Sequence, residues 1–266
     1  MRYPEIISLG QNCEVKENLI AWWEELSERD QAFDRDCLQH RGNHLFDWNI
    51  TDHWRLVEIL TRNLDGIFER HNLHALEKTD GVHNYVRDDG TGILFHHTFT
   101  RINGFASQET VDLEYDEKLP KIRYLVEKFR AILKSESHIY FVRRGDADTI
   151  SVQRMIETFD AIRAGRPYSL IIVSYSPCDH KSSDISPNLT EFSIPLEEAW
   201  KLEHWRPIFN FILADAAKKS GDKKYYNTYF HKDGTFRERA GVATWYQMVR
   251  DLMWGKRRPR EKLVPL

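Results

Sequence analysis

The sequence predicts an α/β fold with three layers, in which helices cover both faces of a mostly parallel β-sheet. Two observations favour this class: apolar runs typical of buried strands at residues 6–9, 138–142 and 169–174, and amphipathic helical patterns between them. Strands that alternate with helices generally pair in parallel, because each crossover helix returns the chain to the same end of the sheet. The 266 residues contain no repeat or low-complexity linker, so we expect a single domain over 1–266.

The first hundred residues predict a strand, two helices and a hairpin. A buried strand at 6–9 is followed by a helix whose apolar residues are Val15, Leu19, Trp22, Trp23 and Leu26. The polar stretch 27–42 interrupts this pattern and is expected to be a loop or an insertion. Thr51 is placed to cap a helix that carries Val57, Leu60 and Leu64. Residues 80–97 are typical of a hairpin with a tight turn near Asp89 and Gly90.

The rest of the chain alternates more regularly. Pro120 is expected to precede an amphipathic helix with an inward face of Ile122, Leu125, Val126, Phe129, Ile132 and Leu133. After the strand at 138–142, a second helix is expected to end at Gly165, and the strand at 169–174 follows. Residues 189–194 predict a weaker strand. Helices around 196–218 and 242–254 and a basic tail at 255–266 complete the prediction.

Composition excludes several classes of protein. Hydrophobic residues make up 41% and aromatic residues 12%, enough for a sizeable core, and the formal net charge is −3 with a pI of about 6.5. Nothing in this balance indicates a nucleic-acid partner or an anionic membrane surface. No apolar window is long enough for a membrane span, and the N-terminus does not read as a signal peptide. Three cysteines, Cys13, Cys37 and Cys178, fit free thiols in a cytoplasmic protein.

Polar side chains are expected to gather at one edge of the predicted sheet. Ligands of open α/β sheets bind beyond the carboxyl ends of the strands. Cys13 follows the first predicted strand, Arg143 and Arg144 follow the second, and Tyr175 follows the third. The two arginines have two interpretations: a solvated loop, or a fork that binds a carboxylate or phosphate.

Cys13 is the strongest candidate for chemistry at this edge. It lies where a strand stops and a helix starts, and the unpaired N–H groups of a helix N-terminus favour a thiolate, which is the nucleophile. Gly10 allows the sharp turn, and the Asn12 amide lies beside the thiol in sequence. The alternative is a small buried cysteine that packs under the helix.

A thiol nucleophile needs a base, and the best candidates are His96 and His97. Alternation along a strand points one ring inward and the other outward, so we expect only one to act. Asp47 would either orient that imidazole or cap a turn. No metal site is expected, because His71 and His74 lack a third ligand at a useful spacing.

Four blocks occur in order: Ile-Ser-Leu-Gly-Gln-Asn-Cys-Glu-Val, Leu-Phe-Asp-Trp, Leu-Phe-His-His-Thr-Phe and Ile-Tyr-Phe-Val-Arg-Arg. Over residues 5–180 the chain resembles an uncharacterised domain family described as papain-like cysteine peptidases. The resemblance implies Cys13 as nucleophile, Asp47 as the acid and His97 as base, since the family's histidine is followed by one residue and then an aromatic. Leu45 and Thr98 depart from the family, which has a proline and an acidic residue at these positions.

The resemblance also bears on the fold. Papain-like α+β folds carry the cysteine on a long helix and the histidine on a separate antiparallel sheet. The opening Gly-x-Asn-Cys is also similar to enzymes of bacterial capsule and surface-glycan synthesis, which resemble the three-layer hydrolases with a serine after their first strand. Because helices and strands alternate after residue 118, we expect a flavodoxin-like or SGNH-hydrolase-like architecture, with the papain-like fold as the alternative.

The function that we expect is a cysteine-dependent hydrolase or acyltransferase. His97 would deprotonate Cys13, and the thiolate would attack an ester, thioester or amide of a small molecule, glycan or peptide. Backbone N–H groups and Asn12 would bind the oxyanion, while His96, Arg143, Arg144 and Tyr175 would bind substrate. No cofactor is expected beyond an acyl thioester donor such as coenzyme A. The alternatives are an acyltransferase of surface polysaccharide synthesis and a non-catalytic glycan- or nucleotide-binding domain; no segment indicates an oligomeric state.

Overall fold

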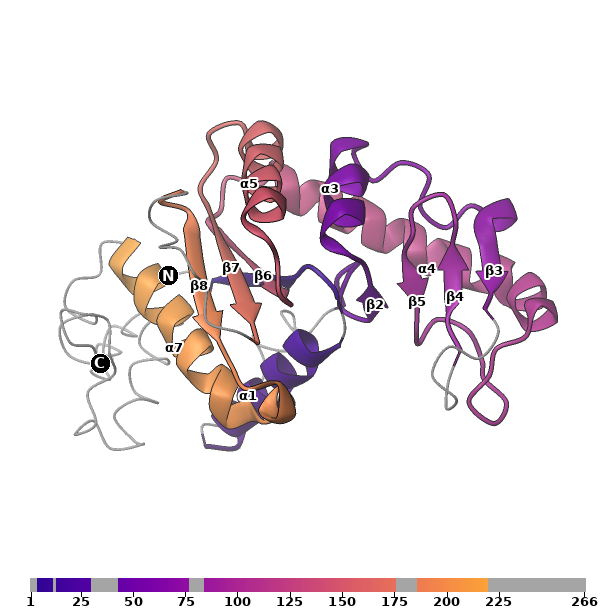
Figure 1. The fold of residues 1–266 in the computed structure, drawn as a ribbon, viewed down its shortest axis with the longest axis horizontal. Helices are drawn as coiled ribbons and strands as arrows, with labels where there is room; N and C mark the ends of the chain where they lie inside the picture. Colours follow the sequence, from indigo (N-terminus) through magenta and orange to yellow (C-terminus); the bar gives the residue numbers. More distant parts are fainter. Residues whose placement is uncertain (1–3, 12, 30–42, 77–83, 176–185, 220–266) are drawn as a thin grey trace, which may run out of the picture. The chain divides into compact units, whose positions relative to one another are not determined.

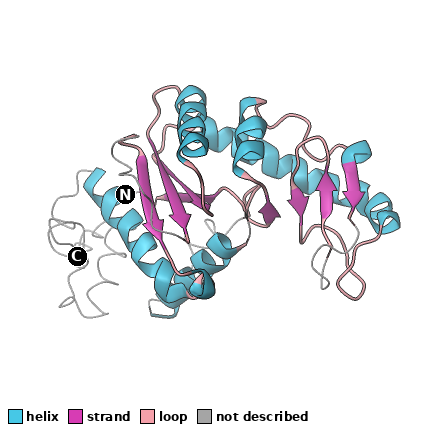
Figure 2. Ribbon diagram, in the orientation of Figure 1, coloured by secondary structure: helices cyan, strands magenta, loops and turns pink. Residues whose placement is uncertain are grey.

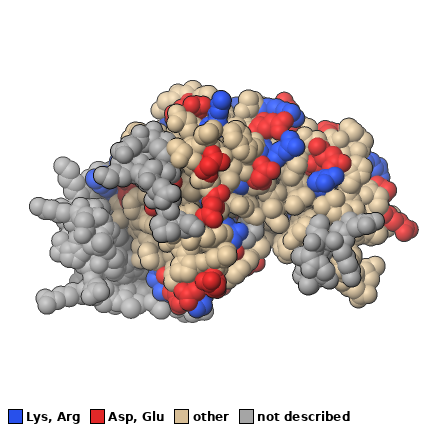
Figure 3. Space-filling model, viewed as in Figure 1, with Lys and Arg blue, Asp and Glu red and all other residues tan. Residues whose placement is uncertain are grey.

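The computed structural model describes residues 4–11, 13–29, 43–76, 84–175 and 186–219. The chain divides into two compact units: a smaller unit of Met1–Glu5, Leu19–Arg41 and Leu202–Leu266, and a larger unit of Ile6–Asn18 and Gly42–Lys201. Of the described helices, none is long and apolar enough to cross a membrane. Acidic and basic side chains are interspersed over the described surface that Figure 3 shows.

A four-stranded sheet in the order β1-β6-β7-β8 confirms the mixed α/β prediction (Figure 1). Its strands are β1 (Glu5–Ser8), β6 (Ile139–Arg144), β7 (Tyr168–Ser174) and β8 (Leu189–Ser193). β6, β7 and β8 pair in parallel, and every residue of β7 is buried, as a central strand requires. The strand predicted at 138–142 continues to residue 144, so Arg143 and Arg144 lie within β6 instead of following it.

Two of the predicted helices flank β6 in the chain, and the second of them connects β6 to β7. α5 (Thr149–Arg163) ends through Ala164 and Gly165, both in left-handed conformations, which confirms the predicted end. α4 (Gln108–Lys134) buries the predicted inward face, but it begins twelve residues before Pro120. The Ser107 hydroxyl caps it by accepting the N–H of Thr110 at 3.1 Å, and Pro120 lies inside the helix. The prediction that Pro120 precedes the helix is therefore wrong.

The helix predicted after Thr51 is α3 (His53–Thr61), which lies beside α5 (Figure 1). Its cap is Asp52, whose carboxylate accepts the N–H of Arg55 at 2.7 Å. Thr51, the predicted cap, is buried, and Leu64 lies beyond the helix with a positive φ. An ionised carboxylate is a strong cap, and here it lies one residue closer to the helix than the threonine.

A second sheet, antiparallel, has the order β2-β5-β4-β3 (Figure 2). Its strands are β2 (Asn49–Ile50), β3 (Leu73–Ala75), β4 (Val86–Asp88) and β5 (Leu94–Phe95), and the short η1 (Arg70–Asn72) precedes β3. β4 and β5 confirm the predicted hairpin. Asp88 closes its turn by accepting the N–H groups of Gly90 and Thr91. The prediction of one parallel sheet thus covers only half of the strands.

The smaller unit contains most of α1 (Glu14–Arg29) and α7 (Leu202–Lys219), and η2 (Leu196–Glu198) comes shortly before α7 in the chain. Trp22 and Phe209 pack with ring centroids 5.1 Å apart, and Arg206 donates to both carboxylate oxygens of Glu25, at 2.8 and 3.0 Å. Both predicted helices are confirmed, although α1 continues into the polar stretch expected from residue 27. Residues 30–42, the helix predicted at 242–254 and the tail 255–266 lie outside the described residues.

Candidate functional site

The loop between β1 and α1 turns sharply at two successive residues with positive φ. Gly10 has φ +79° and Gln11 has φ +87°. A side chain at Gly10 would bring Cβ to 3.1 Å from the Asn49 carbonyl oxygen, so glycine is required both by conformation and by space. Gln11 holds this conformation without being a glycine, at a strain of about 1 kcal/mol. Strain of this kind is characteristic of loops that present a functional side chain.

Gly145, just after β6, provides the space for Gln11. A Cβ on Gly145 would overlap the Gln11 side chain, and the φ of Gly145 is +117°. Its N–H donates to the Val173 carbonyl at 2.8 Å, which fixes it against the end of β7. The loop after β1 is therefore held between the turn at 46–49 and the end of β6, which brings three of the four sequence blocks together.

Cys13 is a free, partly exposed thiol at the start of α1. Burial, the charge of Glu17 and a hydrogen bond to the Glu17 carboxylate raise the pKa of the thiol to about 11. Glu14 adds to this effect. The direction is opposite to the one that the helix N-terminus predicted, and the thiol is neutral at pH 7.

Arg144 lies beside this thiol and is held by two neighbours. Its Nε is 2.7 Å from a Glu14 carboxylate oxygen, and its guanidinium lies 4.1 Å above the centre of the Tyr175 ring. The Tyr175 hydroxyl donates to the same Glu14 oxygen at 3.3 Å. Burial lowers the pKa of Arg144, while Glu14 and Cys13 oppose that shift. Cys13, Arg144 and Tyr175, which the sequence assigned to one sheet edge, thus lie together.

Arg143 occupies a different position from Arg144. It is fully buried, and its guanidinium donates to the Leu9 carbonyl at 2.5 Å and to the Thr51 carbonyl. Its Nε donates to His53 Nδ1 at 3.3 Å, and burial lowers the pKa of Arg143 to about 9. These contacts connect β6 to the segments around it. The Arg143 guanidinium is therefore directed at protein groups, whereas the sequence analysis expected it to bind substrate.

Asp47 forms a buried ion pair that the sequence did not predict. Its carboxylate lies 3.0 Å from the Lys16 ammonium, and the side chains of both residues are almost fully buried. The same carboxylate accepts the N–H of His44 at 2.7 Å. Burial raises the pKa of Asp47, and Lys16 opposes that rise. Lys16 lies between Val15 and Leu19 in an apolar helical pattern, so nothing in the sequence signalled it as the partner.

His96 and His97 follow β5 on the antiparallel sheet. Their ring centroids are 4.0 Å apart, and His97 meets Trp48 edge to face at 5.7 Å. Burial is the largest cause of the raised pKa of the Cys13 thiol, and the charged side chains that add to it are the carboxylates of Glu17 and Glu14. The ion pair of Asp47 is with Lys16, and the side-chain hydrogen bond that acts on the Cys13 thiol comes from Glu17.

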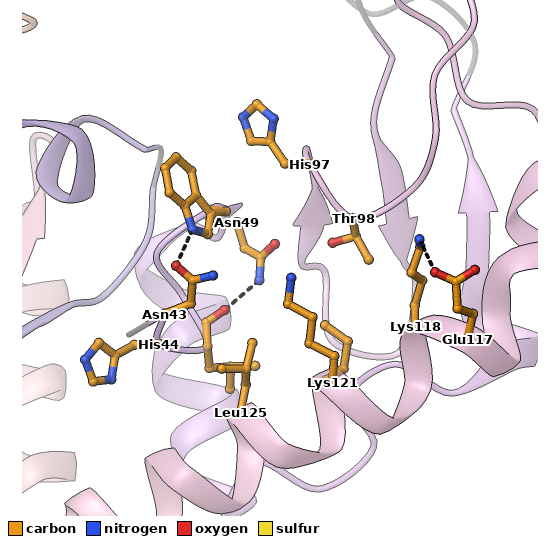
Figure 4. A pocket seen from close by; sticks show the side chains of 12 residues that line it. Asn43, His44, Asn49, His97, Thr98, Glu117, Lys118, Lys121 and Leu125 are labelled. Atoms are coloured by element: carbon orange, nitrogen blue, oxygen red, sulfur yellow. Dashed lines mark hydrogen bonds and ion pairs between the residues drawn. The ribbon is translucent and has the colours of Figure 1, made fainter. Parts of the chain in front are cut away.

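His97 instead lies at a cavity of about 540 Å³ in the larger unit. The walls of the cavity are residues 43–45, 48–49 and 97–98 and the middle of α4, and Cys13 is not among the lining residues. Figure 4 shows His97, Asn49 and Lys121 around this cavity. The structure therefore presents two separate candidate sites: the Cys13 edge of the parallel sheet and the His97 cavity.

Three predicted features fall outside the described residues: Asn12, Cys37 and Cys178. Sequence reasoning missed Glu14 and Glu17, because acidic residues in the first turn of a helix are common for electrostatic reasons alone. Within the described ranges, no group of three potential metal ligands is found. Comparisons with protein-family models, with curated proteins and with solved structures find no significant match to this chain.

Proposed function

We propose that this protein is a cysteine-dependent hydrolase or acyltransferase in which Cys13 is the nucleophile. The observation that supports the proposal is the arrangement at the sheet edge. A partly exposed thiol at a helix N-terminus is hydrogen-bonded to Glu17 and lies beside Arg144, after a strained turn. A nucleophile within electrostatic range of both a carboxylate and a guanidinium is suited to acyl transfer.

The base in this proposal is Glu17 and not His97. Because the thiol is neutral at pH 7, the thiolate must form when substrate is bound. Glu17 is already in hydrogen-bond contact with the thiol, so it accepts the proton from Sγ. Arg144 then stabilises the thiolate, since the two charges lie within electrostatic reach of each other. The attraction between Arg144 and the thiolate lowers the free-energy cost of deprotonating Cys13, a cost that is high because the pKa of the thiol is raised.

The reaction proceeds through a thioester on Cys13. The thiolate attacks the carbonyl carbon of an ester, thioester or amide, and backbone N–H groups at the start of α1 bind the oxyanion. The leaving group departs with the proton that Glu17 took from the thiol. Water or a sugar hydroxyl, deprotonated by Glu17, then attacks the thioester, and the proton returns to Sγ. Water as acceptor gives a hydrolase, and a hydroxyl gives an acyltransferase.

The proposal extends to substrate and architecture. Arg144 fits an acyl donor or acceptor that carries a carboxylate or phosphate, and coenzyme A thioesters meet that description. We place the enzyme in the cytoplasm, on a three-layer α/β architecture. The parallel sheet supports the three-layer fold, and the antiparallel sheet, whose strand β5 the two histidines follow, supports the papain-like alternative.

Steady-state hydrolysis of p-nitrophenyl acetate by four proteins tests the assignment of the base. Glu17→Gln is expected to lower the rate by about 10²-fold or more, and Cys13→Ala to abolish it. His97→Gln, the matched control, should leave the rate unchanged. A large loss in His97→Gln with full activity in Glu17→Gln would return the base to His97 and overturn this mechanism. Activity retained by Cys13→Ala would overturn the proposed function itself.

A further inference from the structure

The cavity at His97 has a lining that suits a polar small molecule. Its volume of about 540 Å³ lies within the range of small-molecule sites. Figure 4 shows the Asn49 amide oxygen, the Thr98 hydroxyl and the Lys121 ammonium directed into the same space, while the Asn49 amide nitrogen donates to the Leu45 carbonyl at 2.7 Å. These groups come from three different segments of the larger unit: β2, the chain after β5, and α4.

The cations of this cavity are not equivalent. Lys118 lies 2.9 Å from Glu117 and 3.5 Å from Glu114, so its charge is compensated by carboxylates of the same helix. The described residues offer Lys121 no hydrogen bond or ion pair. The acidic residue of the lining, Glu117, is the one that pairs with Lys118. Among the described lining residues, the uncompensated charge is therefore that of Lys121, an exposed side chain, and it favours an anionic ligand.

An aromatic group lies beside these polar groups. Trp48 is part of the lining, and its indole N–H donates to Asn43 Oδ1 at 3.1 Å, which fixes the ring. His97 meets it edge to face. Rings held in this way offer an apolar surface against which the C–H face of a sugar packs, while amides and hydroxyls bind the sugar hydroxyls.

We infer that this cavity binds a sugar that carries a phosphate or a carboxylate. Lys121 pairs with the anionic group, the Asn49 amide oxygen and the Thr98 hydroxyl bind ring hydroxyls, and Trp48 packs against the ring. The inference stands on the cavity alone and does not depend on chemistry at Cys13. The two anionic groups share the same recognition by Lys121, and the experiment distinguishes them.

Isothermal titration calorimetry on the full chain tests this inference with four probes: glucose 1-phosphate, glucuronate, glucose and inorganic phosphate. At least one acidic sugar is expected to bind about tenfold more tightly than both glucose and inorganic phosphate. The acidic sugar that binds more tightly identifies the anionic group. Lys121→Gln should weaken that binding about tenfold, whereas Lys121→Arg should retain it.

The matched control is Lys134→Gln, because Lys134 is an exposed lysine on the same helix and does not line the cavity. Its affinity for the acidic sugars should equal that of the unmodified chain. Equal weakening by Lys121→Gln and Lys134→Gln would show a general charge effect and overturn the inference. So would binding of inorganic phosphate as tight as that of the acidic sugars, or the absence of binding at about 10 mM probe.

Discussion

The sequence position of Cys13 predicts which residues surround the thiol, but it does not predict the direction in which the thiol pKa shifts. The helix N-terminus favours the thiolate, but burial and two carboxylates in the first turn of α1 act in the opposite direction. Those carboxylates are close because they lie on the same turn of the helix as the thiol. The same proximity makes Glu17 available as a base.

The pH dependence of iodoacetamide labelling reports this environment directly. Because the thiolate is the reactive form and the pKa is raised to about 11 from 9.0, labelling of folded Cys13 should rise only well above pH 9. Glu17→Gln removes a charge and an acceptor that raise the pKa, so it should shift the labelling curve to lower pH. Mass spectrometry of the labelled peptide measures both curves. An unshifted curve in Glu17→Gln would mean that Glu17 does not contact the thiol.

The pair of Lys16 and Asp47 makes a prediction about stability. Asp47→Asn leaves the buried Lys16 ammonium without its counter-charge, so the free energy of unfolding in urea should fall by about 3 kcal/mol. Lys16→Met combined with Asp47→Asn removes both charges and should recover much of that loss. If Asp47→Asn alone were as stable as the original chain, the buried ion pair would not exist in solution.

At the scale of secondary structure, the sequence predicts long elements well and short ones poorly. The strands of the parallel sheet follow from apolar runs, and β7 is buried throughout. The strands of the antiparallel sheet have two or three residues, too few for alternation to be visible, so only the hairpin around Asp89 was predictable. The start of α4 was missed because residues 108–118 are largely charged and Pro120 usually marks a beginning.

The cap of α4 can be tested by substitution. Ser107→Ala removes the acceptor for the Thr110 N–H, and the free energy of unfolding should fall by about 1 kcal/mol. Ser107→Asp keeps an acceptor and adds a charge that is favourable at a helix N-terminus, so it should preserve stability. Urea denaturation followed by circular dichroism measures both variants. Equal loss in the two variants would place the start of the helix elsewhere.

At the scale of the whole molecule, the sequence predicts which side chains lie at the sheet edge, whereas tertiary packing determines the partners of the buried charged residues. Cys13, Arg144 and Tyr175 were assigned to one edge because parallel strands share their carboxyl ends, and they do lie together. The partners of Asp47 and Arg143 depend on how the turn at 46–49 packs against the first turns of α1 and the end of β1. No periodicity or motif encodes that packing.

The central claim is that Cys13 forms a covalent acyl intermediate. The most direct measurement is intact-mass spectrometry with peptide mapping after brief incubation with p-nitrophenyl acetate or acetyl-coenzyme A. We expect one acetyl group on Cys13, none on Cys37 or Cys178, and slower acetylation in Glu17→Gln. Acetylation of Cys37 or Cys178 with Cys13 unmodified would contradict it, and Cys13 would then be a packing residue of α1.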